Sequence, residues 1–429
     1  MPNELSKSFL RRSRTSAFTL LELLLVIAII SVLAGLVIFN LRPASVLQDT
    51  NAVKEKEVSN QIEKSIQTYT VEKGGEYPFA TSGLEQTAYS ICKQGETTNC
   101  GVNIDDLVAN GYVQNIPTNE GAEGNTTGYM LKYTDKVIKV GPSKLACPTG
   151  YVGVPGNPLY QTEDFCVMQY EAKYDCTGDG DGDSAIACSA TDEDGYAGLD
   201  YRDIVSFSPA NIVSTANGAP VVHITQTQAL SACPTGHHLI TNKEWMTIAR
   251  NIEAQTSNWA NGVIGSTIAS GGGLFRGNNG PVDSTSYSGA LNPEQGTGRS
   301  NKAKFILSNG SELWDLAGNV WEMTSDTLTG EGQPDVLGQN GFAWRQLNIL
   351  TGFGSLSSDL LRPHGVAYDA NNGIGTIYHD SNSASSTVYV VFRGSYWWSW
   401  ANGGLYGTGM NITPTDQYSF VGFRCAVVL

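Results

Sequence analysis

The feature that most limits what this chain can fold into is an uninterrupted apolar run near its start. Residues 18–39 read FTLLELLLVIAIISVLAGLVIF, and Glu22 is the only charged side chain among them. As a helix this run would extend roughly 33 Å, which is enough to cross a bilayer. It is too long for an ordinary signal peptide, whose apolar core is short. The sequence therefore predicts a membrane-spanning helix.

The residues around this run indicate more than a simple anchor. The first 17 residues carry four basic side chains and one acidic side chain, so the positive-inside rule places them in the cytoplasm. A carboxylate one turn into an apolar run costs roughly a few kcal/mol to bury, so Glu22 implies a role inside the membrane.

This N-terminus resembles the type IV pilin and pseudopilin family. The matching residues are Thr15-Ser16-Ala17 followed by Phe18-Thr19-Leu20-Leu21-Glu22. The resemblance implies that a prepilin peptidase cleaves between Ala17 and Phe18 and that the new N-terminus is methylated. It also implies that Glu22 pairs with a neighbouring pilin subunit's terminal amine during assembly. The family usually has Gly where this chain has Ala17. The precursor is then expected in the inner (cytoplasmic) membrane, and the mature protein on a pilus or the cell surface.

The chain after the run predicts a small module followed by a large one. Pro43 marks a kink or break, and residues 52–72 have the apolar spacing of an amphipathic helix that ends at Gly74-Gly75. The pieces IDDLVANGYVQNIP and GYMLKYTDKVIKV resemble the small sheet of pseudopilins. We expect four parts: a prepilin leader (1–17), a transmembrane and pilin helix (18–75), a pilin-type β domain (76–144, here the β module) and a C-terminal display domain (145–429, here the head).

Charge and cysteine content limit the partners and the chemistry. The net charge is −15, and an acidic exported portion lacks the clustered Lys and Arg that nucleic acid requires. The eight cysteines form no CxxC pair, so zinc-ribbon and redox functions are weakly indicated. Disulfides are the default in an exported protein, although eight cysteines allow on the order of 100 pairings. Cys92 and Cys100 could close a small loop.

The head contains short segments that resemble the formylglycine-generating-enzyme (sulfatase-modifying factor) family. In order, these are DFCVMQYEAKY (164–174), ALSACPTGHHLITNKEWMTIAR (229–250), WDLAGNVWEMTSD (314–326), FRGSYWW (392–398) and VGFRCAV (421–427). The resemblance implies a loop-rich, elaborated C-type-lectin fold, so the whole chain is expected to be α+β. Within it, Thr241 and Glu244 form a capping-box pattern that predicts a helix start.

The resemblance also implies a disulfide between Cys233 and Cys425. It would close a loop of about 190 residues, worth about 5 kcal/mol in the chain-entropy model. The simplest pairing of the remainder is then Cys147 with Cys166 and Cys176 with Cys188.

The residues argue against catalysis. The family's oxidase needs two copper-binding cysteines just after the RGGSY-type motif, and thiolates are the ligands that select Cu(I). Here that place is Tyr396 to Gly403, without cysteine. Another branch of this fold uses iron held by three histidines, but the five histidines show no ligand spacing: His223, His237, His238, His364 and His379. We therefore predict no catalytic residues.

Calcium is the one metal that the sequence suggests. Asp179, Asp181 and Asp183 alternate with glycines and offer oxygen ligands at close spacing; the alternative is a solvated acidic loop. In some family members the GNVWE turn binds calcium, which would carry over to Asn319, Val320 and Glu322. The alternative there is a purely structural turn.

Residues 395–420 have the composition of a binding surface. Tyr, Trp, Ser, Gly and Asn dominate, as in paratopes, where aromatic rings give rigid contact area and Ser and Asn adapt their hydrogen bonds. The segment resembles the variable region of diversity-generating retroelement target proteins, in which adenine-directed mutation varies surface residues. An Asn codon changed only at adenines cannot become Trp, so Trp398 would need another origin. The candidate contact residues are Tyr396, Trp398, Ser399, Trp400, Gly409, Asn411, Asp416, Tyr418 and Phe420.

These observations favour a pilin-anchored protein that displays a non-catalytic head toward an external protein or glycan ligand. One alternative is a structural minor pilin or a type II secretion pseudopilin with a spacer head, which predicts that Trp398 and Trp400 are buried or contact a neighbouring subunit. A second alternative is a formylglycine-generating-type oxidase.

Overall fold

The computed structural model describes residues 43–81, 88–98, 100–119, 122, 124–134, 136–142, 145, 147–184, 188, 198–280, 286–287, 300–336, 340–381 and 384–429. The expected leader and membrane span lie outside these ranges, as do Ala17, Phe18 and Glu22. Within them, no helix combines the length and apolar character that crossing a membrane requires. The chain divides into two compact units, Met1–Lys54 and Glu55–Leu429.

Helix α2 precedes the β module and packs against its three-stranded sheet. Helix α2 spans Pro43–Glu72 and is followed by the turn at Gly74 and Gly75. It begins nine residues before the predicted start at residue 52, because proline is tolerated in the first helical turn. The other elements are β1 (Ala88–Cys92), α3 (Asp106–Ala109), β2 (Thr126–Thr134) and β3 (Val137–Pro142).

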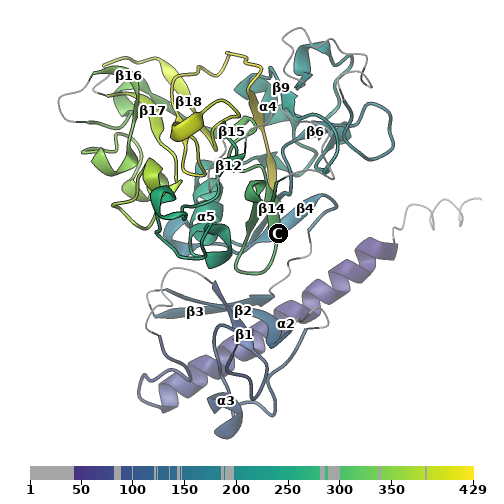
Figure 1. Ribbon diagram of the computed structural model, residues 1–429. Coiled ribbons are helices and arrows are strands. Elements are labelled where there is room, and N and C mark those ends of the chain that lie inside the picture. The colour runs from purple at the N-terminus through teal and green to yellow at the C-terminus, as the bar shows by residue number, and fades with distance from the viewer. Residues whose placement is uncertain are drawn as a thin grey trace, which may run out of the picture. The chain divides into compact units, whose positions relative to one another are not determined.

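The sheet of the β module is antiparallel, in the order β1-β2-β3, and β2 and β3 form a hairpin that contains the piece GYMLKYTDKVIKV of the sequence analysis. Ile62 and Ile66 of α2 are buried against Ile91 of β1 and Leu131 of β2. Helix and sheet thus share one apolar core, and Figure 1 shows the three strands packed along the helix.

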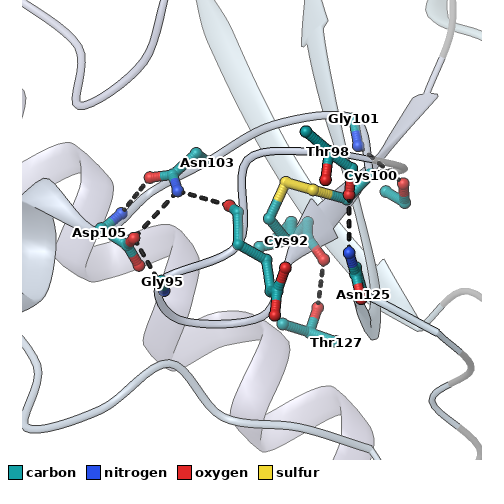
Figure 2. Close-up of a disulfide and its surroundings, with 12 residues drawn as sticks. Cys92, Gly95, Thr98, Cys100, Gly101, Asn103, Asp105, Asn125 and Thr127 are labelled. Carbon is teal, nitrogen blue, oxygen red and sulfur yellow. Dashed lines mark hydrogen bonds between the residues drawn. A yellow bond between two sulfur atoms is a disulfide. The ribbon is translucent and has the colours of Figure 1, made fainter.

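A disulfide-closed loop follows β1. Cys92 and Cys100 are bonded, and Asn125 donates its side-chain N–H to the carbonyl of Thr98 over 2.9 Å. Asp105 accepts from the backbone N–H of Gly95 over 2.9 Å and from the Asn103 amide over 3.0 Å. Figure 2 shows these side chains reaching into the loop from both sides. The loop is therefore held by side chains where strand pairing ends.

In its described residues, the head has two α-helices, several short 3-10 helices and many short strands. The helices are α4 (Gln226–Ala232) and α5 (Asn242–Glu253). The first strands are β4 (Tyr151–Val154), β5 (Phe165–Met168), β6 (Lys173–Tyr174), β7 (Leu199–Asp200), β8 (Ile212–Val213), β9 (Val221–Val222), β10 (His238–Leu239), β11 (Gly277–Asn278) and β12 (Ser286–Tyr287). The remaining strands are β13 (Lys304–Ile306), β14 (Glu312–Trp314), β15 (Trp321–Thr329), β16 (Gly341–Arg345), β17 (Ile377–Ser381), β18 (Val388–Arg393), β19 (Thr408–Gly409), β20 (Val421–Phe423) and β21 (Cys425–Val428).

Two sheets organise the head. The larger has six strands in the order β16-β17-β19-β18-β15-β20, and the smaller has four in the order β10-β21-β5-β4. Figure 1 shows β16, β17, β18 and β15 following one another across the head. Helix α5 begins at the predicted capping box, in which Thr241 and Glu244 bond reciprocally, and it buries Trp245 in the core. The fold is α+β and loop-rich, as expected.

All eight cysteines are paired in the structure. Besides Cys92–Cys100, the disulfides are Cys147–Cys166, Cys176–Cys188 and Cys233–Cys425. These are the four pairs that the sequence and the family resemblance suggested. Cys233–Cys425 joins the residue after α4 to the first residue of β21, across 192 positions of sequence.

Candidate ligand-binding face

The tryptophan-rich segment leaves β18 and turns outward. Trp398 is 57% exposed and Trp400 is 50% exposed, although both are large apolar side chains that normally prefer the interior. Their ring centroids are 5.9 Å apart. Trp400 has a positive φ of 53°, a backbone conformation that is uncommon for a bulky residue and worth noting at a functional site. By contrast, Trp397 is half-buried against Val222 and Val320.

The rest of the segment adds to the same row of rings. Tyr396 lies 6.0 Å from Trp397 and 4.8 Å from Phe420, and Phe420 stacks on Tyr418 at 5.1 Å between ring centroids. Tyr418 is 39% exposed. Residues at the two ends of the segment are therefore adjacent in space.

A second group of rings, from strands β16, β17 and β18, continues this row. Trp321 of β15 connects the two groups, because its ring lies 6.5 Å from Tyr396 and 6.3 Å from Trp344. Trp344 is 5.0 Å from Tyr378. Phe342 follows at 6.0 Å from Tyr378 and 5.6 Å from Tyr389. We call the set the aromatic face: Trp321, Phe342, Trp344, Tyr378, Tyr389, Tyr396, Trp397, Trp398, Trp400, Tyr418 and Phe420.

Sheet register explains why these rings share a side. Trp344 of β16 is directly opposite Tyr378 of β17, and Tyr378 is opposite Gly409 of β19. Phe342 precedes Trp344 by two residues, so both point to the same side of the strand. This period-two spacing in the segment GFAWR was the signal for Phe342 and Trp344, which the sequence analysis missed together with Tyr378 and Tyr389.

Two of the expected contact residues have almost no surface. Gly409 is buried, and a Cβ added there would lie 2.1 Å from the Phe392 ring. Only glycine fits beneath that ring, so Gly409 supports the face by its packing. Ser399 is 4% exposed, and its hydroxyl accepts from the backbone N–H of Tyr396. The hydroxyl therefore holds the turn and is not presented to solvent.

The remaining expected residues lie at or near the surface. Asn411 is exposed. Asp416 is half-buried, and its carboxylate accepts from the backbone N–H of Thr413 over 2.7 Å. Asp416 therefore shapes the loop locally, whereas Tyr418 and Phe420 are joined by ring stacking.

The GNVWE turn, where the family resemblance suggested calcium ligands, has partners of its own within the fold. Glu322 is fully buried in a two-pronged ion pair with Arg424, with N···O distances of 2.7 and 2.8 Å. The Asn319 carbonyl accepts from the backbone N–H of Trp397 over 3.0 Å. The carboxylate and one carbonyl of the turn are thus engaged within the fold, which favours the alternative of a structural turn.

Glu171, from the segment DFCVMQYEAKY of the sequence analysis, anchors this turn. Its buried carboxylate accepts from the Asn319 side chain over 2.7 Å and from the backbone N–H of Val320 over 3.2 Å. Gly318 at the same turn has φ of 77°, and a Cβ there would lie 2.1 Å from the Asn278 carbonyl oxygen. Two of the sequence motifs thus meet at one point in the fold.

The carboxylates of the acidic loop bind the loop's own backbone. Asp183 accepts from the N–H groups of Cys176 and Thr177 over 2.7 and 2.9 Å. Asp181 accepts from Asn217, and Asp179 accepts from the N–H of Asp181. These bonds already satisfy part of the acceptor capacity of the three carboxylates, which favours an acidic loop without calcium.

The residues present do not fit the copper group of formylglycine-generating enzymes. That site requires two thiolates, and all eight cysteines of this chain are consumed in disulfides. The stretch after the RGGSY-type motif supplies aromatic rings instead. Copper chemistry therefore has no ligand set at this position.

Burial shifts the pKa of two ionisable groups. Both lie on the side of the six-stranded sheet opposite the rings. Burial lowers the pKa of Arg393 to about 10, and its guanidinium donates to the side chains of Asn242 and Thr408. Burial, reinforced by the charge of Arg345, lowers the pKa of His379 to about 4. Both groups lie in the core, so they support the sheet and do not form part of the exposed surface.

The fold and its surface define a class: a loop-rich α+β domain with an exposed aromatic face, on a chain with a pilin-like start. The family of sulfatase-modifying factor enzyme 1-like domains matches residues 168–429, more than half of the chain. The chain therefore belongs to this family. The prokaryotic N-terminal methylation motif matches residues 12–38, which identifies a membrane-anchored precursor.

Solved structures give a weaker comparison. The M1, P3c and U1 variants of the Major Tropism Determinant are 13%, 12% and 14% identical to the chain, with TM-scores of 0.31, 0.30 and 0.30. Each match covers 80% of this chain and 72% of the other. Scores this low carry no argument about function. No curated protein is significantly similar to the chain.

Proposed function

We propose that this protein is a pilin-anchored, non-catalytic display protein whose head binds an external ligand through the aromatic face. The observation that carries the proposal is the exposure of Trp398 and Trp400 within a continuous row of aromatic rings. Large exposed apolar patches mark interaction sites, and Trp and Tyr are the residues that most often dominate binding energy. The ligand is an external protein or glycan.

The methylation motif supports the anchoring half of the proposal. Prepilin peptidase would cleave before Phe18, and Glu22 would pair with the terminal amine of a neighbouring pilin subunit. The precursor would reside in the inner membrane, and the head would be displayed on a pilus or at the cell surface.

Retroelement-type diversification of residues 396–420 would suit this arrangement. Trp398, Asn411 and Tyr418 are exposed, so changes there leave the core intact. Gly409 and Ser399 would stay constant, because each is committed to packing or to the turn. Deep sequencing of these codons across a cell population tests this part. A uniform segment would mean a fixed binding surface.

The function itself is tested by screening the full chain, in micelles of an uncharged detergent, against arrays of surface proteins and glycans. A ligand should lose at least about tenfold in affinity on double substitution Trp398→Ala and Trp400→Ala, which removes about 1.4 kcal/mol or more. The matched control is Val263→Ala with Ile264→Ala, two exposed apolar residues outside the aromatic face. Equal loss in both variants would contradict the proposed site.

The alternative of a structural minor pilin draws on the same two tryptophans. They are not buried within their own chain, so this alternative now requires that a neighbouring subunit covers them. It predicts that the double substitution reduces pilus assembly and that the screen of the full chain finds no ligand.

A further inference from the structure

The surroundings of the aromatic face are unusually poor in positive charge. Residues 305–429 contain ten acidic residues, four arginines and no lysine. Three of those arginines, Arg345, Arg393 and Arg424, are buried. The fourth, Arg362, lies 4.7 Å from the Phe353 ring and donates to backbone carbonyls. Residues 305–429 thus bring almost no unengaged cation to this surface.

The basic groups at the edge of the face are also engaged. Arg276 is buried and donates to the Trp400 carbonyl over 3.1 Å. His223 donates its backbone N–H to the Tyr418 carbonyl, and its ring lies 3.1 Å from the carboxylate of Asp200. In the described part of the chain, no Lys or Arg side chain lies over the ring of Trp344, Trp398, Trp400 or Tyr418.

An acidic side chain lies among the rings instead. Asp380 of β17 is directly opposite Phe342 of β16 and two residues after Tyr378. Directly opposed residues project to the same side of a sheet, so Asp380 shares the ring side of the sheet. It is half-buried, and among the described residues no salt bridge neutralises it.

Exposed π faces and an unneutralised carboxylate are complementary to positive charge. A guanidinium or ammonium over the face of Trp or Tyr is attracted by the ring quadrupole, and a nearby carboxylate adds to that attraction. An anionic ligand would meet no compensating cation. A neutral glycan would stack on the rings and donate hydroxyl hydrogen bonds to Asp380, but it would gain no attraction between opposite charges there.

We propose that the aromatic face binds a protein surface that presents arginine or lysine side chains, with those cations seated over the exposed rings and paired with Asp380. This inference rests on the proposed function and narrows its ligand to a cationic protein. Trp398 and Trp400 would take one cation, and the Phe342, Trp344 and Tyr378 group beside Asp380 would take another.

The test uses a charge-only comparison of two peptides. One is a short peptide of alternating Gly and Arg, and the other replaces each Arg by citrulline, which keeps the shape and removes the charge. The full chain, in micelles of an uncharged detergent, carries 5-fluorotryptophan at its eight tryptophans, and single Trp→Phe variants assign the fluorine signals. The arginine peptide should move the signals of Trp344, Trp398 and Trp400. The core residues Trp245 and Trp259, which are buried, serve as internal controls.

Affinity for the citrulline peptide should be weaker by at least about fivefold. Asp380→Asn should weaken arginine-peptide binding about threefold and leave the citrulline peptide unchanged. Glu331→Gln makes the same charge change at an exposed site outside the face and should leave both peptides unchanged. An equal loss in Glu331→Gln would mean only a general effect of net charge and would overturn the proposal.

The proposal would also be overturned if the two peptides bound equally, or if neither moved the Trp344, Trp398 and Trp400 signals. A neutral oligosaccharide such as maltohexaose that moved these signals, with no response to arginine, would reject the cationic ligand but retain the proposed binding function. If a ligand found in the screen bound the Trp398→Ala, Trp400→Ala variant with unchanged affinity, the aromatic face would be rejected as the binding site.

Discussion

The β module and the head stabilise their interiors in different ways. The core of the β module consists of apolar side chains from one helix and one sheet, such as Ile66 against Ile91 and Leu131. The head buries charged side chains as well, among them Glu171, Glu322 and Arg424. The core of the β module is thus apolar, whereas the core of the head also contains buried charges.

The difference follows from where backbone hydrogen bonds go. In a helix packed on a sheet, nearly all buried N–H and C=O groups bond within the elements. The head has long loops, so its buried side chains bond loop backbone directly. Lys173 donates to the carbonyls of Thr215 and Asn217 in the loop after β8, and Arg424 donates to those of Met168 and Trp314, the last residues of β5 and β14. The head therefore depends on particular polar residues, whereas the β module depends on packed volume.

The largest effect should come from opening the long covalent loop of the head. Cys233→Ala with Cys425→Ala removes a closure of 192 residues, worth about 5 kcal/mol in the chain-entropy model, whereas Cys92→Ala with Cys100→Ala should cost about 2–3 kcal/mol. Hydrogen-exchange mass spectrometry of the full chain reports each region separately. Equal losses for the two pairs would contradict the loop-length explanation.

Breaking the buried ion pair should destabilise the head by about 3–5 kcal/mol. Glu322→Gln leaves Arg424 buried without a countercharge, as both side chains are almost fully buried. The double change Glu322→Met with Arg424→Met should recover much of that loss, since it removes both charges. Denaturant unfolding of the full chain measures this. A loss under about 1 kcal/mol for Glu322→Gln would show that the pair is not needed.

Removing packed volume should weaken the β module instead. Ile66→Ala deletes buried methyl groups from a fully buried site and should cost about 3 kcal/mol there. Hydrogen exchange of residues 126–134 should rise, while exchange of the head core stays unchanged. Val71→Ala, at an exposed position of the same helix, is the control and should have an effect below about 0.5 kcal/mol.

A further effect should be absent at neutral pH and appear only in acid. The pKa of buried His379 is lowered to about 4, whereas the unfolded chain has a value of about 6.5. The unfolded state therefore takes up the proton first, so stability is retained above pH ~6.5 and falls as the pH drops toward 4, by up to about 3 kcal/mol. His379→Gln should remove this part of the pH dependence. An unchanged slope in unfolding experiments between pH 6.5 and 4 would contradict it.

Much of the framework could be predicted from sequence because its signals are local. The capping box at Thr241, the hairpin of β2 and β3, and the short-range cysteine pairs depend on residues close together in the chain. Cys233–Cys425 required the family resemblance, since nothing local links positions so far apart. The aromatic face was predicted in part. Residues 396–420 are distinguished by their composition, whereas Phe342 and Trp344 are distinguished only by their spacing.

The sequence by itself determined the order of the parts, the processing motif, the family and the aromatic composition of one segment. Only the tertiary structure decided which of those residues reach the surface. Gly409 is buried because Phe392 covers it, and Trp344 joins Trp321 because β16 lies in the same sheet as β15. Propensity and spacing act over a few residues, whereas exposure in a loop-rich fold depends on contacts between distant segments, such as that between Trp321 and Tyr396.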